Sequence, residues 1–461
     1  MSFSRAGLAS MAPALKPLVG ALVLAFGAVG AQAQSLTEVV QAARSYDATY
    51  LGARSSADAA RYRYEEQRAL HLPSANLVVT AGRQTSDTPY QPSQTTGSQN
   101  SATGTVNASQ TLFNRQNDLA IDAAQKSADL ANSQLAQAEQ DLIVRVSQAY
   151  FNVLAAADAL QSVKGNSKAI AEQLASAKRN FEVGNATITD TREAEARADQ
   201  AHSQQIAAEN DLQVSQVTLD QMVGRNGVVP HPLILPAMLP PVMPSQVSDW
   251  VALAEADNPT LQQARMGLEI AELTTAGAKA GHLPTLVLNG QYGRNRQSQT
   301  YSTGDAQLYG PGGRFSGNGS NSGVSVTLTV PLFAGFQIQN RVRETVALED
   351  KARTDLEGAR STATLNTRTA FLGALTQSAQ VKALEAAESS SKLALDATVL
   401  GYKVGVKVNL DVLNAQSQLY STQRDLATAR YNYLVSTLKL RQAAGNLTGN
   451  DLLPIDALLV K

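Results

Sequence analysis

The feature that most constrains this chain is an internal duplication. The tripeptide His-Leu-Pro at 71–73 recurs at 282–284, which is 211 residues further along. Leu-Phe at 112–113 recurs at 332–333, an offset of 220, and the later matches are 221 residues apart. These later matches are Ala149-Tyr150 with Ala370-Phe371, Val183-Gly184 with Val404-Gly405, Asp190 with Asp411, and Gly224 with Gly445. The sequence therefore predicts two copies of one structural plan, which differ mainly in the length of one loop.

Both copies have the same predicted order of elements: helix, strand, strand, long helix, shorter helix. The first repeat is predicted at 34–224, with a helix at 35–70, a β-hairpin at 73–113, a long helix at 117–181 and a helix at 191–223. The second is predicted at 248–445, with a helix, a hairpin at 284–333, a long helix at 337–402 and a helix at 411–444. Strands are expected at 73–84, 103–113 and 285–294, and polar loops at 86–100 and 297–322. A linker with six prolines at 225–247 and a C-terminal segment at 446–461 are expected to lie around the middle of the helical part.

The segment Gly323–Phe336 indicates what kind of strand the hairpins contain. Apolar residues at 324, 326, 328, 330 and 332 alternate with small polar residues, which gives a strand with one apolar and one hydroxylated face. In a soluble sandwich the apolar face would lie in a core. In an outer-membrane barrel it would face lipid, and the polar face would line a wet lumen. Expected strands of about 9 to 11 residues suit a tilted membrane barrel.

The N-terminus predicts export from the cytoplasm. Arg5 and Lys16 precede an apolar run from Leu18 to Val29, and a small-x-small site at 31–33 follows, so 1–33 is interpreted as a signal peptide. An ordinary buried helix is the alternative. Without these residues the chain keeps 36 of its 38 basic residues against 39 acidic ones, a balance that gives no support for a nucleic-acid partner. The absence of cysteine excludes disulfides, thiol catalysis and zinc-thiolate sites.

The long helices indicate a hollow wall rather than a solid bundle. The segments at 117–181 and 337–402 contain no proline, and each would be about 100 Å long at 1.5 Å per residue. The Val-Gly pairs at 183–184 and 404–405 then mark turns. Two half-length helices stacked end to end would match one long helix. The apolar stripe is narrow and rich in alanine, so coiled-coil packing with water on two sides is expected.

Four strands per chain cannot close a membrane barrel, because about eight is the minimum and open edges would aggregate. The barrel must therefore be shared with other copies. Two chains would give eight strands with a filled interior, and three would give twelve strands with a lumen.

Several motifs resemble the TolC family of outer-membrane exit ducts. They are the two His-Leu-Pro strand starts, Pro331-Leu332-Phe333, Gly401-Tyr402-Lys403-Val404-Gly405, Asp411-Val412-Leu413 and Ala429-Arg430-Tyr431-Asn432-Tyr433-Leu434. The resemblance covers essentially the whole chain after residue 33. It implies an α+β membrane protein: a homotrimer with one twelve-stranded transmembrane barrel in the Gram-negative outer membrane and a long α-helical coiled-coil tunnel in the periplasm. Gln34 stands where lipid-anchored relatives carry cysteine, so the chain resembles the unlipidated branch.

The same resemblance implies a function and partners. A passive duct of a tripartite efflux pump or type I secretion system would open when a periplasmic adaptor and an inner-membrane transporter of the RND or ABC type dock. The alternatives are a general diffusion porin, which leaves the long helices without a purpose, and a periplasmic coiled-coil structural or adaptor protein, which leaves the strands unexplained. An enzyme is disfavoured, because no catalytic, cofactor or metal constellation is visible, and His71 and His282 are interpreted as structural.

The candidate functional residues also come from the resemblance. A lock near the periplasmic tip would join Tyr402 and Lys407 to Thr189 and Asp190 of a neighbouring helix pair. Lysine stands where the family commonly has arginine, and it loses the two-pronged bond to a carboxylate, so a weaker lock is expected. Alternatively, Thr189 and Asp190 only cap the helix that follows them.

A ring of carboxylates is the second candidate. Three copies of Asp411 would surround the narrowest point of the tunnel, where Asn414 replaces the family's second acidic residue. Half the charge predicts weaker cation selectivity than in relatives with both acids. As a plainer reading, Asp411 is a helix N-cap. Tyr431 and Tyr433 are expected to pack between helices rather than to contact cargo.

Overall fold

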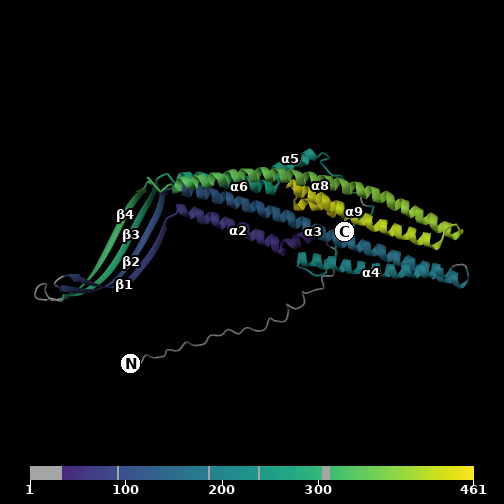
Figure 1. Ribbon diagram of the computed structural model, residues 1–461, viewed down its shortest axis with the longest axis horizontal. Coiled ribbons are helices and arrows are strands. Elements are labelled where there is room, and N and C mark those ends of the chain that lie inside the picture. The colour runs from purple at the N-terminus through teal and green to yellow at the C-terminus, as the bar shows by residue number, and fades with distance from the viewer. Residues whose placement is uncertain (1–33, 91–92, 185–186, 237–238, 304–311, 461) are drawn as a thin grey trace, which may run out of the picture.

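The computed structural model describes residues 34–90, 93–184, 187–236, 239–303 and 312–460. The predicted signal peptide at 1–33 lies outside these residues. The molecule is long, with a β-sheet at one end and helices that run from it to the opposite end (Figure 1).

The described strands form one antiparallel sheet in the order β1-β2-β3-β4. The strands are β1 Ser74–Tyr90, β2 Ser93–Phe113, β3 Thr285–Thr303 and β4 Gly313–Thr329. The two hairpins are adjacent because β2 pairs with β3, and this pairing has an irregularity between Thr111 and Phe113. The register is otherwise continuous, from Ser74 opposite Ser109 to Tyr90 opposite Ser93 in the first hairpin.

The expected strand lengths were wrong. The strands contain 17 to 21 residues, so most of the segments expected as loops, 86–100 and 297–322, are strand. Threonine, serine, glycine and asparagine resemble a loop when a segment is considered alone. Here each such residue within the four strands has a partner on a neighbouring strand, and the ladder of backbone hydrogen bonds continues beyond the apolar part of the strand.

The two long helices are α3 Arg115–Glu182 and α8 Gln337–Lys403. The side chain of Asn114 caps α3 by accepting from the amides of Gln116 and Asn117. Each long helix is followed by a shorter helix, α4 Ile188–Val223 and α9 Asn409–Ala444. Glycines with left-handed backbone, Gly224 and Gly445, end the shorter helices.

The helices that precede the hairpins are broken, where the first was expected to be continuous from 35 to 70. The first consists of α1 Leu36–Arg44, α2 Ala48–Arg68 and the short η1 Ala69–His71. Asp47 separates α1 from α2, because its carboxylate caps the amide of Tyr50 and thereby starts a new helix. In the second half, α5 Val247–Asp257 and α6 Pro259–Ala280 are separated by Asn258, which caps α6 in the same way.

Half-length helices lie end to end along each long helix. Figure 1 shows α2 beside the part of α3 nearest the sheet and α4 beside its far part, and it shows α6 and α9 in the same relation to α8. The helical part of the molecule therefore has a similar thickness along its length.

The largest core lies midway along the helices. Leu36 and Val39 of α1 pack there with Tyr150 and Phe151 of α3 and Leu434 of α9. The C-terminal elements η2 Gly449–Leu452 and α10 Leu453–Asp456 join this core. The proline-rich segment also runs here: the amide of Ile234 donates to Leu458, and that of Val460 donates to Pro232. This middle belt, where the core, the proline-rich segment and the C-terminal elements meet, connects the helices on either side of it.

Candidate functional site

The sheet has one apolar and one polar face. Leu77, Val106 and Tyr292 lie in one row across β1, β2 and β3, and Leu288 lies opposite Val326 two rows nearer the helices on the same face. These side chains are exposed: the exposed fraction is 66% for Leu77 and 81% for Val324 on β4. The other face is formed mainly by Ser, Thr, Asn, Gln and Gly. Neither face is covered by a core within the described part of the chain.

The edges of the sheet are also open. Among the described residues, β1 and β4 each have one strand neighbour, so each has a row of backbone amides and carbonyls without a cross-strand partner. An edge of 17 residues is long for an isolated sheet and would promote association with another chain.

The junction between the sheet and the helices is built from aromatic and polar contacts. Phe333 and Phe336 lie edge to face, with ring centroids 5.5 Å apart. His71 lies 3.4 Å from the carboxylate of Asp118 on α3, and its carbonyl accepts from the side chain of Gln110 at 2.6 Å. His71 therefore contributes to the joint between the hairpin and α3.

The helical wall is held by small buried residues and a few polar contacts. Tyr431 and Tyr433 are 4% and 1% exposed, so the expectation that they pack between helices is confirmed. The hydroxyl of Tyr431 donates to Asp158 of α3 at 2.6 Å, and the hydroxyl of Tyr433 donates to the carbonyl of Pro240. Burial raises the pKa of Asp158 above its ordinary value, although the Tyr431 hydrogen bond and the nearby Arg430 oppose this shift.

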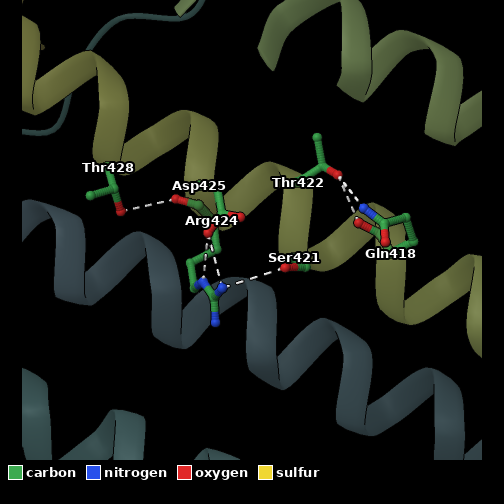
Figure 2. Close-up of polar contacts among 6 residues, drawn as sticks. All are labelled: Gln418, Ser421, Thr422, Arg424, Asp425 and Thr428. Carbon is green, nitrogen blue, oxygen red and sulfur yellow. Dashed lines mark hydrogen bonds and ion pairs between the residues drawn. The ribbon is translucent and has the colours of Figure 1, made fainter. Parts of the chain in front are cut away.

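Several polar side chains of α9 also have partners within their own helix. Figure 2 shows Arg424, which donates to Asp425 at 2.9 Å and to Ser421 at 3.4 Å. On the next turn, the side chain of Gln418 donates to the hydroxyl of Thr422 at 3.3 Å. These residues give the wall a hydrophilic surface without a specific cluster of one charge.

Both long helices end at the end of the molecule far from the sheet (Figure 1). Gly184 and Gly405 have φ of +76° and +81°, which favours glycine, and each follows the C-cap valine of a long helix. In the second turn the carbonyl of Gly401 accepts from the amides of Val406 and Lys407. A Cβ on Gly401 would lie 2.9 Å from Cγ of Lys407, so the lysine side chain packs directly over this glycine.

Among the described residues, no hydrogen bond or ion pair joins the two halves of the expected lock. The hydroxyl of Tyr402 instead accepts from Asn180 of α3 at 3.4 Å. Asp190 accepts from both the amide and the hydroxyl of Thr187, which is the N-cap of α4. Thr189 is exposed in the first turn. The cap therefore lies two residues before Thr189, and Asp190 is the third residue of the helix.

The expected ring residues also have partners within the chain. Lys407, which precedes α9, lies 3.5 Å from the carboxylate of Asp411 in the first turn of that helix. The side-chain oxygen of Asn414 accepts from Arg197 of α4 at 3.3 Å. Asn180 and Arg197 had no signal in the sequence, because they reach Tyr402 and Asn414 only through the packing of one helix pair against another.

Two further properties concern metals and helical membrane spans. The described residues contain no group of three or more His, Asp or Glu side chains that could hold a metal ion. None of the helices in the described ranges combines the length and apolar character needed to cross a bilayer.

Comparison with known proteins identifies the family. The chain matches the family described as Outer membrane efflux protein over residues 34–225 and 250–446. The chain belongs to this family. Efflux proteins of this kind are channels rather than enzymes, and the family match decides against a periplasmic structural protein.

Relatives and solved structures agree with this assignment. Outer membrane protein TolC of Vibrio cholerae is 31% identical over 433 residues, which cover 92% of this chain and 94% of the relative. Alkaline protease secretion protein AprF of Pseudomonas aeruginosa is 30% identical over 334 residues, covering 70% and 65%. The crystal structure of the outer membrane protein VceC from Vibrio cholerae superposes with a TM-score of 0.72 at 19% identity, covering 89% of this chain and 96% of that one. A structure of CusC gives 0.74 at 17% identity, covering 90% and 92%.

These findings confirm the function expected from the resemblance. The efflux protein is an outer-membrane exit duct for efflux and secretion, and it lies in the outer membrane of a Gram-negative bacterium. The diffusion porin is thereby disfavoured.

Proposed function

We propose that three copies of this chain form one twelve-stranded barrel, continued by a periplasmic tunnel of helices. The observation that carries this proposal is the sheet itself, which has two unpaired edges and an exposed apolar face. β1 and β4 run in opposite directions, so β4 of one subunit can pair with β1 of the next in the antiparallel pattern of the other strands. Twelve strands leave a lumen, whereas eight would be filled by side chains.

The family match over two segments, 34–225 and 250–446, supports the duplication behind this arrangement. The same order of elements occurs in both segments, and each contributes one hairpin and one long helix. Three chains would thus contribute six hairpins to the barrel and six helix pairs to the tunnel wall.

We expect a periplasmic adaptor to dock at the tip, with an inner-membrane transporter supplying the energy. The turns at the tip expose apolar side chains, with exposed fractions of 69% for Val183, 67% for Val404 and 79% for Val406. Valines on two adjacent turns, repeated three times, would form an apolar ring, and exposed apolar surface of this kind is typical of an interaction site.

The lock remains a proposal, with Tyr402 and Lys407 of one subunit contacting Thr189 and Asp190 of the next. Both charged groups already have partners within their own chain, Asp190 through Thr187 and Lys407 through Asp411. A contact between subunits would compete with these partners, which supports a weak lock that an adaptor can open.

The ring of Asp411 is likewise proposed as the constriction of the tunnel. Lys407 lies 3.5 Å from this carboxylate, and Asn414 adds no charge, so the ring has less negative potential than one with two acids per subunit. The duct would therefore prefer cations only weakly.

Cross-linking between subunits tests the shared barrel. The chain contains no cysteine, so an engineered pair reports on one contact only. We would combine Val79→Cys on β1 with a cysteine at Ser320, Ser322 or Val324 on β4, since neighbouring strands bring Cβ atoms within disulfide range. One combination is expected to link all three chains covalently. If none links them, while a pair across β2 and β3 of the same chain forms its disulfide, the barrel is not closed in this way.

A further inference from the structure

The charged residues of the sheet are nearly all arginines. The four strands contain four of them, Arg83 on β1, Arg294 and Arg296 on β3, and Arg314 on β4. Their sequences contain no lysine and one acidic residue, Asp87. The sheet therefore carries a net positive charge, although the whole chain has a formal charge of −1.

The strand register places all four arginines on one face. Residues directly opposite each other in an antiparallel pair point to the same side, and so do residues two apart along a strand. The rows that contain the arginines are Val79-Gly104-Arg294-Ser320, Ala81-Ala102-Arg296-Asn318, Arg83-Asn100-Ser298-Ser316 and Thr85-Ser98-Thr300-Arg314. The next row toward the helices is Leu77-Val106-Tyr292-Ser322, which belongs to the apolar face. The arginines are thus on the same face as the apolar band.

The opposite face carries none of the sheet's arginines. Residues at the same level there are Gln84, Asn295, Gln297 and Asn321. If the arginines served to attract cargo inside the lumen, they would lie on this polar face. Their position on the apolar face indicates a role at the outer surface of the barrel.

The arginines follow the apolar band on the side away from the helices. Arg83 comes two residues after Ala81, and Arg294 two residues after Tyr292, which is about 7 Å along a strand. At its other border the band ends near Phe113 and Phe333, where the chain enters the helices. If the helices lie in the periplasm, as proposed above, the arginines lie at the level of the outer leaflet.

No carboxylate within the described ranges forms an ion pair with these guanidinium groups. All four side chains are exposed, and Nε of Arg314 donates to the hydroxyl of Ser298 at 3.4 Å. Arginine presents a planar set of donors that matches a phosphate, and its aliphatic part can lie along an apolar surface. A cluster of this kind beside a lipid-facing band is suited to anionic headgroups.

We infer that this arginine cluster, Arg83, Arg294, Arg296 and Arg314, binds the phosphate groups of glycolipid headgroups in the outer leaflet. The inference rests on the proposed trimeric barrel, which would present twelve such arginines around its circumference. Glycolipid binding there would fix the height of the barrel in the membrane and supply anionic partners to guanidinium groups that have none among the described side chains.

Binding of purified lipid A tests this inference. The probe is bisphosphorylated lipid A, compared with its enzymatically dephosphorylated form, added to the detergent-solubilised full-length protein and measured by native mass spectrometry. The wild type is expected to bind the bisphosphorylated form at least about tenfold more tightly, because several charge-assisted hydrogen bonds are lost with the phosphates. The variant R294Q/R296Q is expected to lose most of this preference. The matched control R54Q/R63Q, which removes two exposed arginines from α2 instead, is expected to keep it.

Competition experiments distinguish lipid A from other sources of phosphate, and the oligomeric state distinguishes this inference from the proposed barrel. Excess inorganic phosphate should not displace lipid A, and nanodiscs of phosphatidylglycerol should compete less well than lipid A. The inference is overturned if R294Q/R296Q and R54Q/R63Q bind lipid A equally, or if a simple phosphate competes fully. A wild-type protein that forms no trimer overturns the proposed barrel as well, whereas a normal trimer without phosphate preference overturns this inference alone.

Discussion

Replacing Gly445 by alanine tests how tightly the middle belt fixes the end of α9. Gly445 has a φ of +82°, and a Cβ there would lie 2.4 Å from the carbonyl oxygen of Asp257 and 2.5 Å from the backbone nitrogen of Asn258. Both contacts are with backbone, which cannot move aside as the tip of a side chain can. The same junction is held by hydrogen bonds from Gln140 to the carbonyl of Gly445 at 2.9 Å and from Asn258 to Ala443 at 2.8 Å.

The magnitude follows from two separate costs. A left-handed conformation costs alanine about 1–2 kcal/mol. Overpacking against a fixed neighbour adds about 1–3 kcal/mol. Gly227 provides a matched control, because its φ is +78° and a Cβ there would have no atom within 4 Å. Gly227→Ala is therefore expected to show the first cost alone, and Gly445→Ala both.

Thermal unfolding of the two variants, followed by helical ellipticity in detergent, measures the difference. Each kcal/mol corresponds to about 1 °C for a chain of this length, so Gly445→Ala should unfold about 1–3 °C below Gly227→Ala. Equal unfolding temperatures for the two variants would refute the reasoning, because they would mean that the backbone at Asp257 yields without cost.

Substitutions at three further positions give separate tests. Burial is the largest single influence on the pKa of Asp47 and raises it, but the hydrogen bonds and charge of Arg145 together with backbone hydrogen bonds from Tyr50 and Thr49 outweigh burial, so the pKa lies below 3.8. Asp47→Ala should cost about 2 kcal/mol of unfolding free energy at neutral pH. That stabilisation is present above pH 3.8 and is lost as the pH falls through the depressed pKa. The unfolding free energies of wild type and Asp47→Asn should therefore converge in acid. A difference in unfolding free energy that stays constant with pH would contradict this. Asp411→Ala should reduce the cation preference in single-channel recordings with asymmetric salt, and an unchanged reversal potential would exclude the ring. Lys407→Arg should stabilise the closed tip and reduce spontaneous opening, because arginine can bind a carboxylate at two points; more frequent opening than in wild type would count against the lock.

Much of the fold follows from the sequence, because the spacing of apolar residues and the position of turn-forming residues are local signals. The Val-Gly turns and the long proline-free segments predict α3 and α8 to within two residues at each end. The break before α2 has a local signal in Asp47, an aspartate suited to cap a helix, which the prediction of one helix at 35–70 does not take into account.

The rest depends on pairing between distant segments. The outer halves of the hairpins look like loops in isolation, and only the register across each hairpin shows that they are strands. The partners of the tip residues could not be predicted either, because the contact between Asn180 and Tyr402 arises where two helix pairs meet. A family resemblance thus predicts which residue types occupy the site, but it does not predict which residues they contact in this chain.

The central claim is that the hairpins of three subunits close one membrane barrel. Native mass spectrometry of the purified protein in detergent tests it most directly. The account predicts a complex of three chains that dissociates only under denaturing conditions and precipitates when detergent is removed. A monomer that remains dissolved in water without detergent would contradict it.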